Sequence, residues 1–178
     1  MKRAVFFDRD GIVNIRIVSD YVKKIEEFIF IEDFFDLFSI VKRLGYLAIL
    51  VTNQQGIGKG LMTSDDLEKV HNFMNEKLQE KTNYKFDAIY YCPDLAQSGS
   101  KRRKPNPGMF IEAIEHFGID AKNSWTIGDS ITDIEAGKTV GTKTILVGLH
   151  LKNKSADYIF PSVKEVRLFF ENMQNSKE

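Results

Sequence analysis

Carboxylates and a hydroxyl follow three short apolar runs of this sequence. Asp8 and Asp10 follow the first run, Thr52 follows the second, and Asp129 follows a later one, with Asp133 four residues further on. A single aspartate at such a place is usually a cap or a turn former. Several carboxylates at the ends of neighbouring strands would instead suit a hard, oxygen-seeking cation such as Mg²⁺. The pattern therefore predicts a metal-assisted reaction at one edge of a sheet.

A basic segment could bring an anionic substrate to these acids. It comprises Lys101, Arg102, Arg103 and Lys104 and precedes two prolines. Alone, such a run is typical of a solvated loop, a nuclear-localisation signal or a nucleic-acid patch. Beside an acidic cluster, Lys104 is expected to supply one fixed positive charge and Arg103 a planar fork for a second phosphate. Lys101 and Arg102 are expected to be solvated.

The histidines favour more ordinary roles. His71 and His116 fall in helical patterns, where each is expected to be a packing or surface residue. No serine or cysteine nucleophile pairs with them at a recognisable spacing. His150 follows the fifth apolar run on the expected ligand side, so it is a weaker candidate for the border of the site.

Buried strands that alternate with helices would position these residues. The runs that suit strands are Ala4–Phe7, Leu47–Val51, Ala88–Tyr91, Trp125–Ile127, Thr144–Val147 and, more weakly, Tyr158–Phe160. Helical spacing covers five segments. The second begins after Ser64, which can cap it, and runs to Leu78; the others are Phe34–Leu44, Pro107–His116, Ile131–Val140 and Val163–Phe170. The alternation predicts a doubly wound, Rossmann-like α/β fold, with helices on both faces of a parallel sheet. The long segments 11–31 and 92–106 are candidate substrate walls, and neither is long enough for a large cap domain.

Length and composition predict a single domain over 1–178. The chain has 178 residues, 43% of them hydrophobic, and its 25 basic residues balance 25 acidic ones. A net charge of zero argues against nucleic-acid and membrane-surface partners. Cys92 is the only cysteine, so no disulfide can form within the chain. No apolar stretch approaches the ~20 residues of a membrane span, and we expect a cytoplasmic protein for which a monomer is plausible.

Four motifs resemble those of the haloacid dehalogenase-like phosphatases. They are Asp8-Arg9-Asp10-Gly11, Val51-Thr52-Asn53-Gln54, Arg103-Lys104-Pro105-Asn106-Pro107-Gly108-Met109, and Gly128-Asp129-Ser130 with Asp133. Within that superfamily these motifs, together with Tyr91-Cys92-Pro93, are similar to those of the heptose bisphosphate and histidinol-phosphate phosphatases. The likeness extends from about residue 3 to residue 149.

The resemblance implies Mg²⁺-dependent hydrolysis of a small phosphorylated metabolite through an aspartyl-phosphate. Asp8 would be the nucleophile, and Asp10 the general acid and base with a raised pKa. Mg²⁺ would be held by the Asp8 side chain, the Asp10 backbone carbonyl and Asp129. Thr52 would contact the phosphoryl oxygens, and Lys104 would neutralise charge. Asp133 would orient Lys104 or metal-bound water. The implied substrate contacts are Arg9, Ser19, Asp20, Tyr21, Asn53, Gln54, Gln55 and Arg103.

One departure from the resemblance concerns zinc. The similar phosphatases often hold a structural zinc with a Cys-x-His pair and a later Cys-x-Cys pair. Here Cys92 remains, but Asp94, Ser100 and Arg102 stand at the other three places. One thiolate and a carboxylate do not make a closed tetrahedral zinc site, so no structural zinc is expected.

The substrate is the least determined part of the prediction. D-glycero-D-manno-heptose 1,7-bisphosphate, losing its 7-phosphate, is favoured because Arg103 could meet the second phosphate. Histidinol phosphate stays as the alternative, since Asp20 or Asp94 could form an acidic wall for its amine. A receiver-type signalling domain is a remote alternative. Its acceptor aspartate would follow a mid-sequence strand, where this chain has Thr52 and Cys92.

Overall fold

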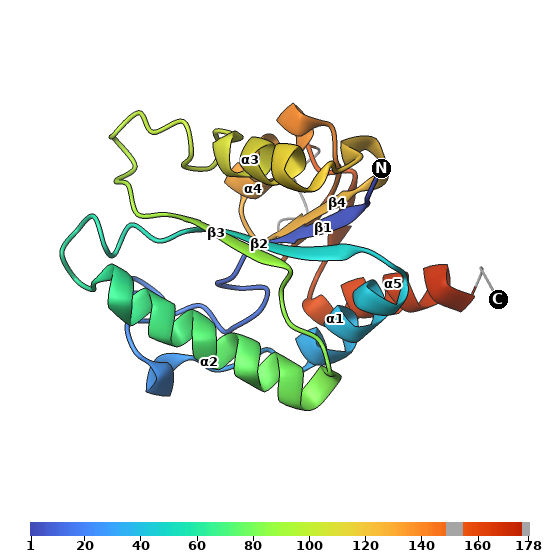
Figure 1. Ribbon diagram of the computed structural model, residues 1–178, viewed down its shortest axis with the longest axis horizontal. Coiled ribbons are helices and arrows are strands. Elements are labelled where there is room, and N and C mark those ends of the chain that lie inside the picture. Colours follow the sequence, from blue (N-terminus) through green and yellow to red (C-terminus); the bar gives the residue numbers. More distant parts are fainter. Residues whose placement is uncertain (149–154, 176–178) are drawn as a thin grey trace.

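The computed structural model describes residues 1–148 and 155–175. Within them, six parallel strands form one sheet in the order β3-β2-β1-β4-β5-β6 (Figure 1). The strands are β1 (Ala4–Phe7), β2 (Leu47–Asn53), β3 (Ala88–Cys92), β4 (Trp125–Gly128), β5 (Lys143–Val147) and β6 (Tyr158–Phe160). The predicted doubly wound fold is confirmed.

Helices cover both faces of this sheet. On one face lie α1 (Asp33–Arg43), α2 (Ser64–Thr82) and α5 (Val163–Asn175), and on the other α3 (Gly108–Phe117) and α4 (Ile131–Val140) (Figure 1). Two single-turn 3₁₀ helices, Ile25–Glu27 and Ala121–Asn123, lie in the connections. No connection within the described residues forms a large cap domain, as predicted.

The central strand is apolar throughout because both of its faces are covered. All four residues of β1 have no exposed surface. Val5 and Phe7 pack toward the helices α1, α2 and α5, whereas Ala4 and Phe6 pack toward the opposite layer. Asp8, which directly follows β1, is therefore attached to a rigid, buried strand.

Two helix ends differ from their predicted positions. Thr63, and not Ser64, is the N-cap of α2: its hydroxyl accepts a hydrogen bond from the Asp66 N–H at 3.1 Å, and the Asp66 carboxylate accepts one from the Thr63 N–H at 2.9 Å. This reciprocal capping box satisfies two backbone donors. A cap formed by the Ser64 side chain alone would satisfy one. At the other end of the chain, α5 continues to Asn175, beyond the predicted Phe170.

The strand order reverses beside β1, between its neighbours β2 and β4. Ligands of doubly wound sheets bind at such a switch point, beyond the carboxyl ends of the strands. The ends of β1, β2 and β4 bring Asp8, Thr52 and Asp129 to this edge, as predicted. His150 lies outside the described residues.

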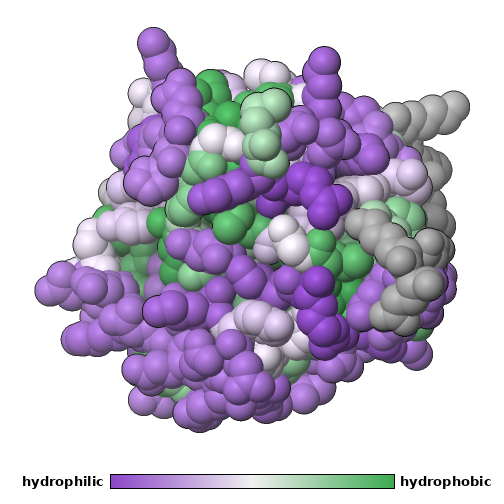
Figure 2. All heavy atoms as spheres, turned by 45° about the vertical axis from the view of Figure 1, so that its right-hand side comes forward, coloured by the Kyte–Doolittle hydropathy of each residue, from purple (hydrophilic) through white to green (hydrophobic). Residues whose placement is uncertain are grey.

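One face of the molecule shows how polar and hydrophobic side chains are distributed on it (Figure 2). The face in Figure 2 is largely hydrophilic, with hydrophobic side chains exposed between polar ones. Among the described residues, no helix has the length and apolar character needed to cross a membrane.

Candidate active site

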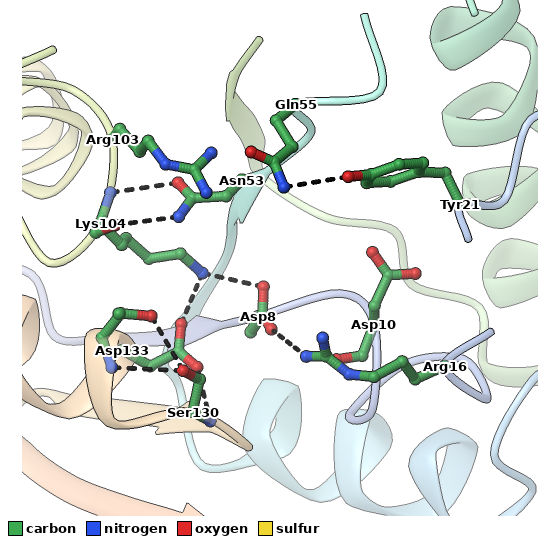
Figure 3. Close-up of a pocket in the computed structure, with 11 residues that line it drawn as sticks. Asp8, Asp10, Arg16, Tyr21, Asn53, Gln55, Arg103, Lys104, Ser130 and Asp133 are labelled. Atoms are coloured by element: carbon green, nitrogen blue, oxygen red, sulfur yellow. Dashed lines mark hydrogen bonds and ion pairs between the residues drawn. The ribbon is translucent and has the colours of Figure 1, made fainter. Parts of the chain in front are cut away.

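Asp8 and Lys104 form the buried centre of the site (Figure 3). The Asp8 backbone N–H donates to the Ile127 carbonyl at 3.0 Å, which continues the pairing of β1 with β4. The Lys104 ammonium donates to Asp8 Oδ1 at 2.8 Å, to Asp133 Oδ1 at 2.5 Å and to the Val51 carbonyl at 2.7 Å. These three acceptors use all three ammonium hydrogens, so the Lys104 side chain has a fixed position beside Asp8.

The backbone of Lys104 is fixed as well. The Asn53 side-chain amide donates to the Lys104 carbonyl at 3.0 Å, and its oxygen accepts from the Lys104 N–H at 3.1 Å. Burial lowers the pKa of Lys104, but the charges of Asp133 and Asp8 outweigh that effect and raise it above its usual value. Lys104 is therefore a permanent cation that the end of β2 holds in place.

Asp133 links Lys104 to the start of α4. Besides its ion pair with Lys104, its carboxylate accepts a hydrogen bond from the Ser130 N–H at 3.1 Å, which closes the capping box of α4. Burial and the charge of Asp8 raise the pKa of Asp133, against the lowering effect of Lys104. The predicted contact of Asp133 with Lys104 is present in the structure.

Asp10 is held by three neighbours. Arg9 Nη2 donates to both of its carboxylate oxygens, at 3.1 and 3.2 Å. Asn14 Nδ2 and Gln54 Nε2 each donate to one of them at 3.0 Å. Burial raises the pKa of Asp10, but the charge of Arg9 and these hydrogen bonds outweigh burial and hold the pKa below its usual value. The predicted raised pKa is therefore wrong for the free site, because cationic and amide donors surround this carboxylate.

Arg16 occupies the point where the candidate metal ligands meet. Its Nη2 lies 2.6 Å from Asp129 Oδ1, 3.1 Å from the Asp10 carbonyl oxygen and 4.0 Å from Asp8 Oδ2. Figure 3 shows the Arg16 side chain pointing toward Asp8. These three oxygens are the ones that the resemblance implied for Mg²⁺. Because they already converge on one cationic nitrogen, and because all three are hard oxygen donors, the site fits a divalent cation.

Carboxylates supply most of the negative charge at this point. One oxygen each from Asp8, Asp129 and Asp133 lies within 4.8 Å of the others, and this is the only such acidic group among residues 1–148 and 155–175. Burial and the charge of Asp8 raise the pKa of Asp129, although Arg16 opposes the shift. Excess negative charge of this kind favours a cation.

Gly11 allows the first loop to approach Asp129. Its φ is +92°, and a Cβ placed on it would lie 2.0 Å from Asp129 Oδ2. Any other residue would both strain the backbone and displace this carboxylate. The glycine that follows Asp10 is thus required by the cation site.

A cavity of about 280 Å³ opens above Asp8. It is lined by Asp8, Asp10, Arg16, Tyr21, Asn53, Gln55, Arg103, Lys104, Ser130, Thr132 and Asp133. Gln55 Nε2 donates to the Tyr21 hydroxyl at 2.9 Å, which joins the segment after β2 to the segment after β1. Arg103 Nη1 donates to the Asp94 carbonyl at 2.9 Å. The cavity therefore has acidic residues at its base and two arginines in its walls.

Not all of the predicted substrate contacts line this cavity. Tyr21, Asn53, Gln55 and Arg103 do. Arg9, Thr52 and Gln54 are buried behind it. Gln54 Nε2 donates to the Thr52 hydroxyl at 2.9 Å as well as to Asp10.

Two further predicted contacts lie in the loop after β1. Ser19 and Asp20 are both exposed and lie outside the cavity lining. Asp20 instead forms an ion pair with Lys23 at 2.7 Å. Ser19 has a φ of +62°, in the left-handed region. This part of the loop precedes the wall residue Tyr21 and does not line the cavity itself.

Two residues were missed by sequence reasoning. Arg16 was expected only as part of a wall, and its partners are distant in sequence, so no local signal could identify it. His71 is only 6% exposed and lies 3.2 Å from Arg9. A signal for its burial was present, since His71 falls on the same helical stripe as Leu67, Val70 and Met74.

Side-chain contacts of Cys92 and Arg102 fix the segment between β3 and α3, where the similar phosphatases often have zinc. Cys92 Sγ donates to Asp94 at 3.4 Å and lies 3.7 Å from the Ser100 hydroxyl. Arg102 was expected to be solvated, and its side chain is 42% exposed, but it also binds both carboxylate oxygens of Glu112, at 2.7 and 3.0 Å, and donates to the Tyr91 carbonyl at 3.1 Å. The bidentate geometry of the guanidinium explains why a half-exposed arginine is fixed here.

The comparisons with known proteins agree with this geometry. The HAD-hydrolase-like protein family matches residues 101–166. The chain is 40% identical to D-glycero-alpha-D-manno-heptose-1,7-bisphosphate 7-phosphatase of Burkholderia mallei over 152 residues, which are 82% of this chain and 79% of the relative. It is 36% identical to the enzyme of the same name from Campylobacter jejuni, over 95% of this chain and 96% of the relative. The D-glycero-beta-D-manno-heptose-1,7-bisphosphate 7-phosphatase of Pasteurella multocida is 34% identical, over 98% of this chain and 100% of the relative.

A solved structure is similar over nearly the whole chain. It is D,D-heptose 1,7-bisphosphate phosphatase from B. bronchiseptica, complexed with magnesium and phosphate, with a TM-score of 0.86 and 26% identity over 97% of this chain and 99% of that one. With relatives at 34–40% identity that it covers over most of their length, this chain belongs to the haloacid dehalogenase-like phosphatases, in the D-glycero-D-manno-heptose-1,7-bisphosphate 7-phosphatase family.

Proposed function

We propose that this phosphatase removes the 7-phosphate of D-glycero-D-manno-heptose 1,7-bisphosphate, with Asp8 as nucleophile and Mg²⁺ as cofactor. The observation that carries the proposal is the cavity above Asp8, which combines a fixed ammonium, a cation site and two wall arginines. The names of the relatives support the substrate.

Phosphoryl transfer to Asp8 is the first step. Asp8 Oδ attacks phosphorus, the bond from phosphorus to the sugar oxygen breaks, and that oxygen takes a proton from Asp10. Asp10 must first be protonated, although its pKa is lowered in the free site. A phosphate dianion placed beside it disfavours its charged form and raises this pKa. Lys104, which lines the cavity, stabilises charge on the phosphoryl oxygens, whereas Thr52 is buried behind the cavity.

Hydrolysis of the aspartyl-phosphate is the second step. Asp10, now ionised, takes a proton from a water molecule whose oxygen adds to phosphorus. The bond from phosphorus to Asp8 then breaks, which restores the Asp8 carboxylate and releases inorganic phosphate. The neighbours that lower the pKa of Asp10 in the free site favour this ionised form.

The Asp8 and Asp129 side chains and the Asp10 carbonyl would hold Mg²⁺. When bound, the ion neutralises the repulsion between the carboxylate nucleophile and the phosphate dianion. Arg16 now contacts these same oxygens, so its guanidinium has to leave them before the ion can bind. Its side chain is 51% exposed, which gives it room to move into the cavity.

The wall charges favour a bisphosphate over histidinol phosphate. An amine on the substrate would need an acidic wall, for which Asp20 and Asp94 were the candidates. Asp20 is paired with Lys23, Asp94 accepts from Cys92, and neither lines the cavity. The lining instead carries Arg16 and Arg103, which suit a second phosphate.

The test is phosphate release with Mg²⁺ from both anomers of heptose 1,7-bisphosphate, histidinol phosphate and simple hexose monophosphates. We expect one equivalent of phosphate and the highest kcat/KM with one bisphosphate anomer. Arg103→Gln should lower that preference, since it removes the contact to the remaining phosphate. Equal, slow release from all substrates would contradict the proposed substrate while leaving the phosphatase chemistry intact.

A further inference from the structure

A buried histidine lies behind the active site, on α2. His71 Nε2 is 3.2 Å from Arg9 Nη1, and both side chains are buried. A guanidinium has donors and no acceptor, so Nε2 must be the acceptor and the ring proton must be on Nδ1. Burial and the charge of Arg9 lower the pKa of His71 to about 3, which agrees with a neutral ring. His71 is therefore a hydrogen-bond acceptor for Arg9.

Arg9 carries this contact to Asp10. Its Nη1 faces His71, while its Nη2 donates to both carboxylate oxygens of Asp10. The Arg9 side chain has no exposed surface, and the Phe28 ring lies 5.9 Å from its guanidinium carbon. Because the guanidinium is planar, fixing Nη1 at His71 also fixes the direction in which Nη2 points. Arg9 therefore bridges the two side chains instead of facing the cavity.

The orientation of Asp10 matters for proton transfer. A general acid must lie within hydrogen-bond distance of the leaving oxygen and in the correct direction. We propose that His71 is a positioning residue which, through Arg9, fixes the Asp10 carboxylate for protonation of the leaving sugar oxygen. This inference rests on the proposed function, in which Asp10 is the general acid.

Substrates with different leaving groups test the role of His71. A sugar oxygen needs a proton as it leaves, whereas p-nitrophenolate is stable without one. We compare kcat/KM, which reports the steps up to loss of the leaving group, for heptose 1,7-bisphosphate and p-nitrophenyl phosphate. The variants are His71→Met, whose thioether is only a weak acceptor, and His71→Gln, whose side-chain oxygen can replace Nε2. Methionine and glutamine are similar in size, so they form a matched pair.

In His71→Met, we expect kcat/KM for the bisphosphate to fall by a factor at least about ten times larger than kcat/KM for p-nitrophenyl phosphate does. A factor of this size corresponds to a partial loss of general-acid catalysis. His71→Gln should retain most of the wild-type ratio between the two substrates. A purely structural role would change both substrates equally, because it alters only the fraction of folded enzyme. Equal losses on both substrates, or no loss in His71→Met, would overturn the proposal.

Two further variants keep the test decisive. Asp10→Asn should show the same leaving-group signature as His71→Met, but larger. If Asp10→Asn lacks the signature, the proposed function of Asp10 fails. If Asp10→Asn shows it and His71→Met does not, only the role of His71 fails. Should the His71 variants not fold, Arg9→Lys keeps the charge but cannot bridge both partners, so it is expected to give the same signature and would overturn the proposal if it did not.

Discussion

At the scale of single residues, Arg16 and a divalent cation require the same oxygens. The Arg16 guanidinium contacts Asp129 and the Asp10 carbonyl and approaches Asp8. The Arg16 nitrogen already lies among these oxygens, so a divalent cation cannot take the same position until the guanidinium has left it. Arg16 is therefore an internal competitor of Mg²⁺.

Replacement of Arg16 by glutamine should tighten Mg²⁺ binding. Because Arg16 is half-exposed, its ion pair is worth about 1 kcal/mol, and we expect the Kd for Mg²⁺ to fall roughly fivefold. Isothermal titration calorimetry measures this Kd directly. Arg103→Gln is the matched control, since it removes a positive charge from the same cavity without freeing a metal ligand. Equal tightening in both variants, or none in Arg16→Gln, would argue against competition.

The residues that were predictable at this scale are those in contiguous motifs. The placement of Asp8, Asp10, Lys104 and Asp129 could be predicted because each follows a recognisable strand or precedes a recognisable helix, and their catalytic roles stay predictions. The lowered pKa of Asp10 could not, because it depends on Gln54 and on a guanidinium whose orientation is visible only in the fold. The same holds for His71, whose partner is 62 residues away.

At the scale of elements, the segment between β3 and α3 carries Arg103 and Lys104 to the site. Its anchor is the bidentate pair of Arg102 with Glu112, in the middle of α3, together with the contact of Arg102 to the end of β3. The absence of a structural zinc stays a prediction.

Arg102→Gln should loosen this segment. We expect the KM for the bisphosphate to rise several-fold in this variant, because Arg103 loses its fixed position. Elemental analysis of the wild-type enzyme should find no stoichiometric zinc. The control is Lys101→Gln, which removes a neighbouring exposed charge and should leave KM unchanged. Tightly bound zinc, or the same KM in Arg102→Gln as in wild type, would contradict the anchoring role.

Element positions were predicted better than element ends. Apolar runs and helical spacing identified the strands and helices, because burial on both faces of a sheet leaves a strong pattern. The start of α2 was misplaced because Thr63 and Ser64 are both good caps, and only the pairing of Thr63 with Asp66 decides between them. The extension of α5 to Asn175 has no capping signal that the sequence could provide.

At the scale of the whole molecule, acid should destabilise the protein through His71. Its pKa in the folded state is lowered to about 3 from 6.5, so the unfolded chain binds the proton more tightly. Stability from this group is fully present above pH 6.5 and is lost progressively as the pH falls toward about 3. The loss amounts to about 1.4 kcal/mol per pH unit within this window.

Urea unfolding of wild type and His71→Gln between about pH 7 and pH 4 measures this effect. The advantage of the wild type over His71→Gln should shrink as the pH falls, because glutamine does not titrate. His116→Gln is the control, since it makes the same exchange at an exposed histidine. A constant difference between wild type and His71→Gln would show that His71 is not buried in neutral form.

The fold as a whole follows from the alternation of buried strands and helices, and it was predicted. What the alternation does not specify is the order of the strands. That order places β1 between β2 and β4, and it thereby brings Asp8, Thr52 and Asp129 together. The burial of β1 on both faces, where its apolar residues pack against both helical layers, agrees with this central place.

The central claim is that Asp8 receives the phosphoryl group, and one measurement tests it most directly. Asp10→Asn is mixed with p-nitrophenyl phosphate and Mg²⁺, and the release of p-nitrophenolate is followed in a stopped-flow instrument. Without the base that hydrolyses the intermediate, we predict a burst of about one equivalent per enzyme, and borohydride reduction should then convert Asp8 to homoserine. Release without a burst, or conversion of an aspartate other than Asp8 to homoserine, would contradict this claim.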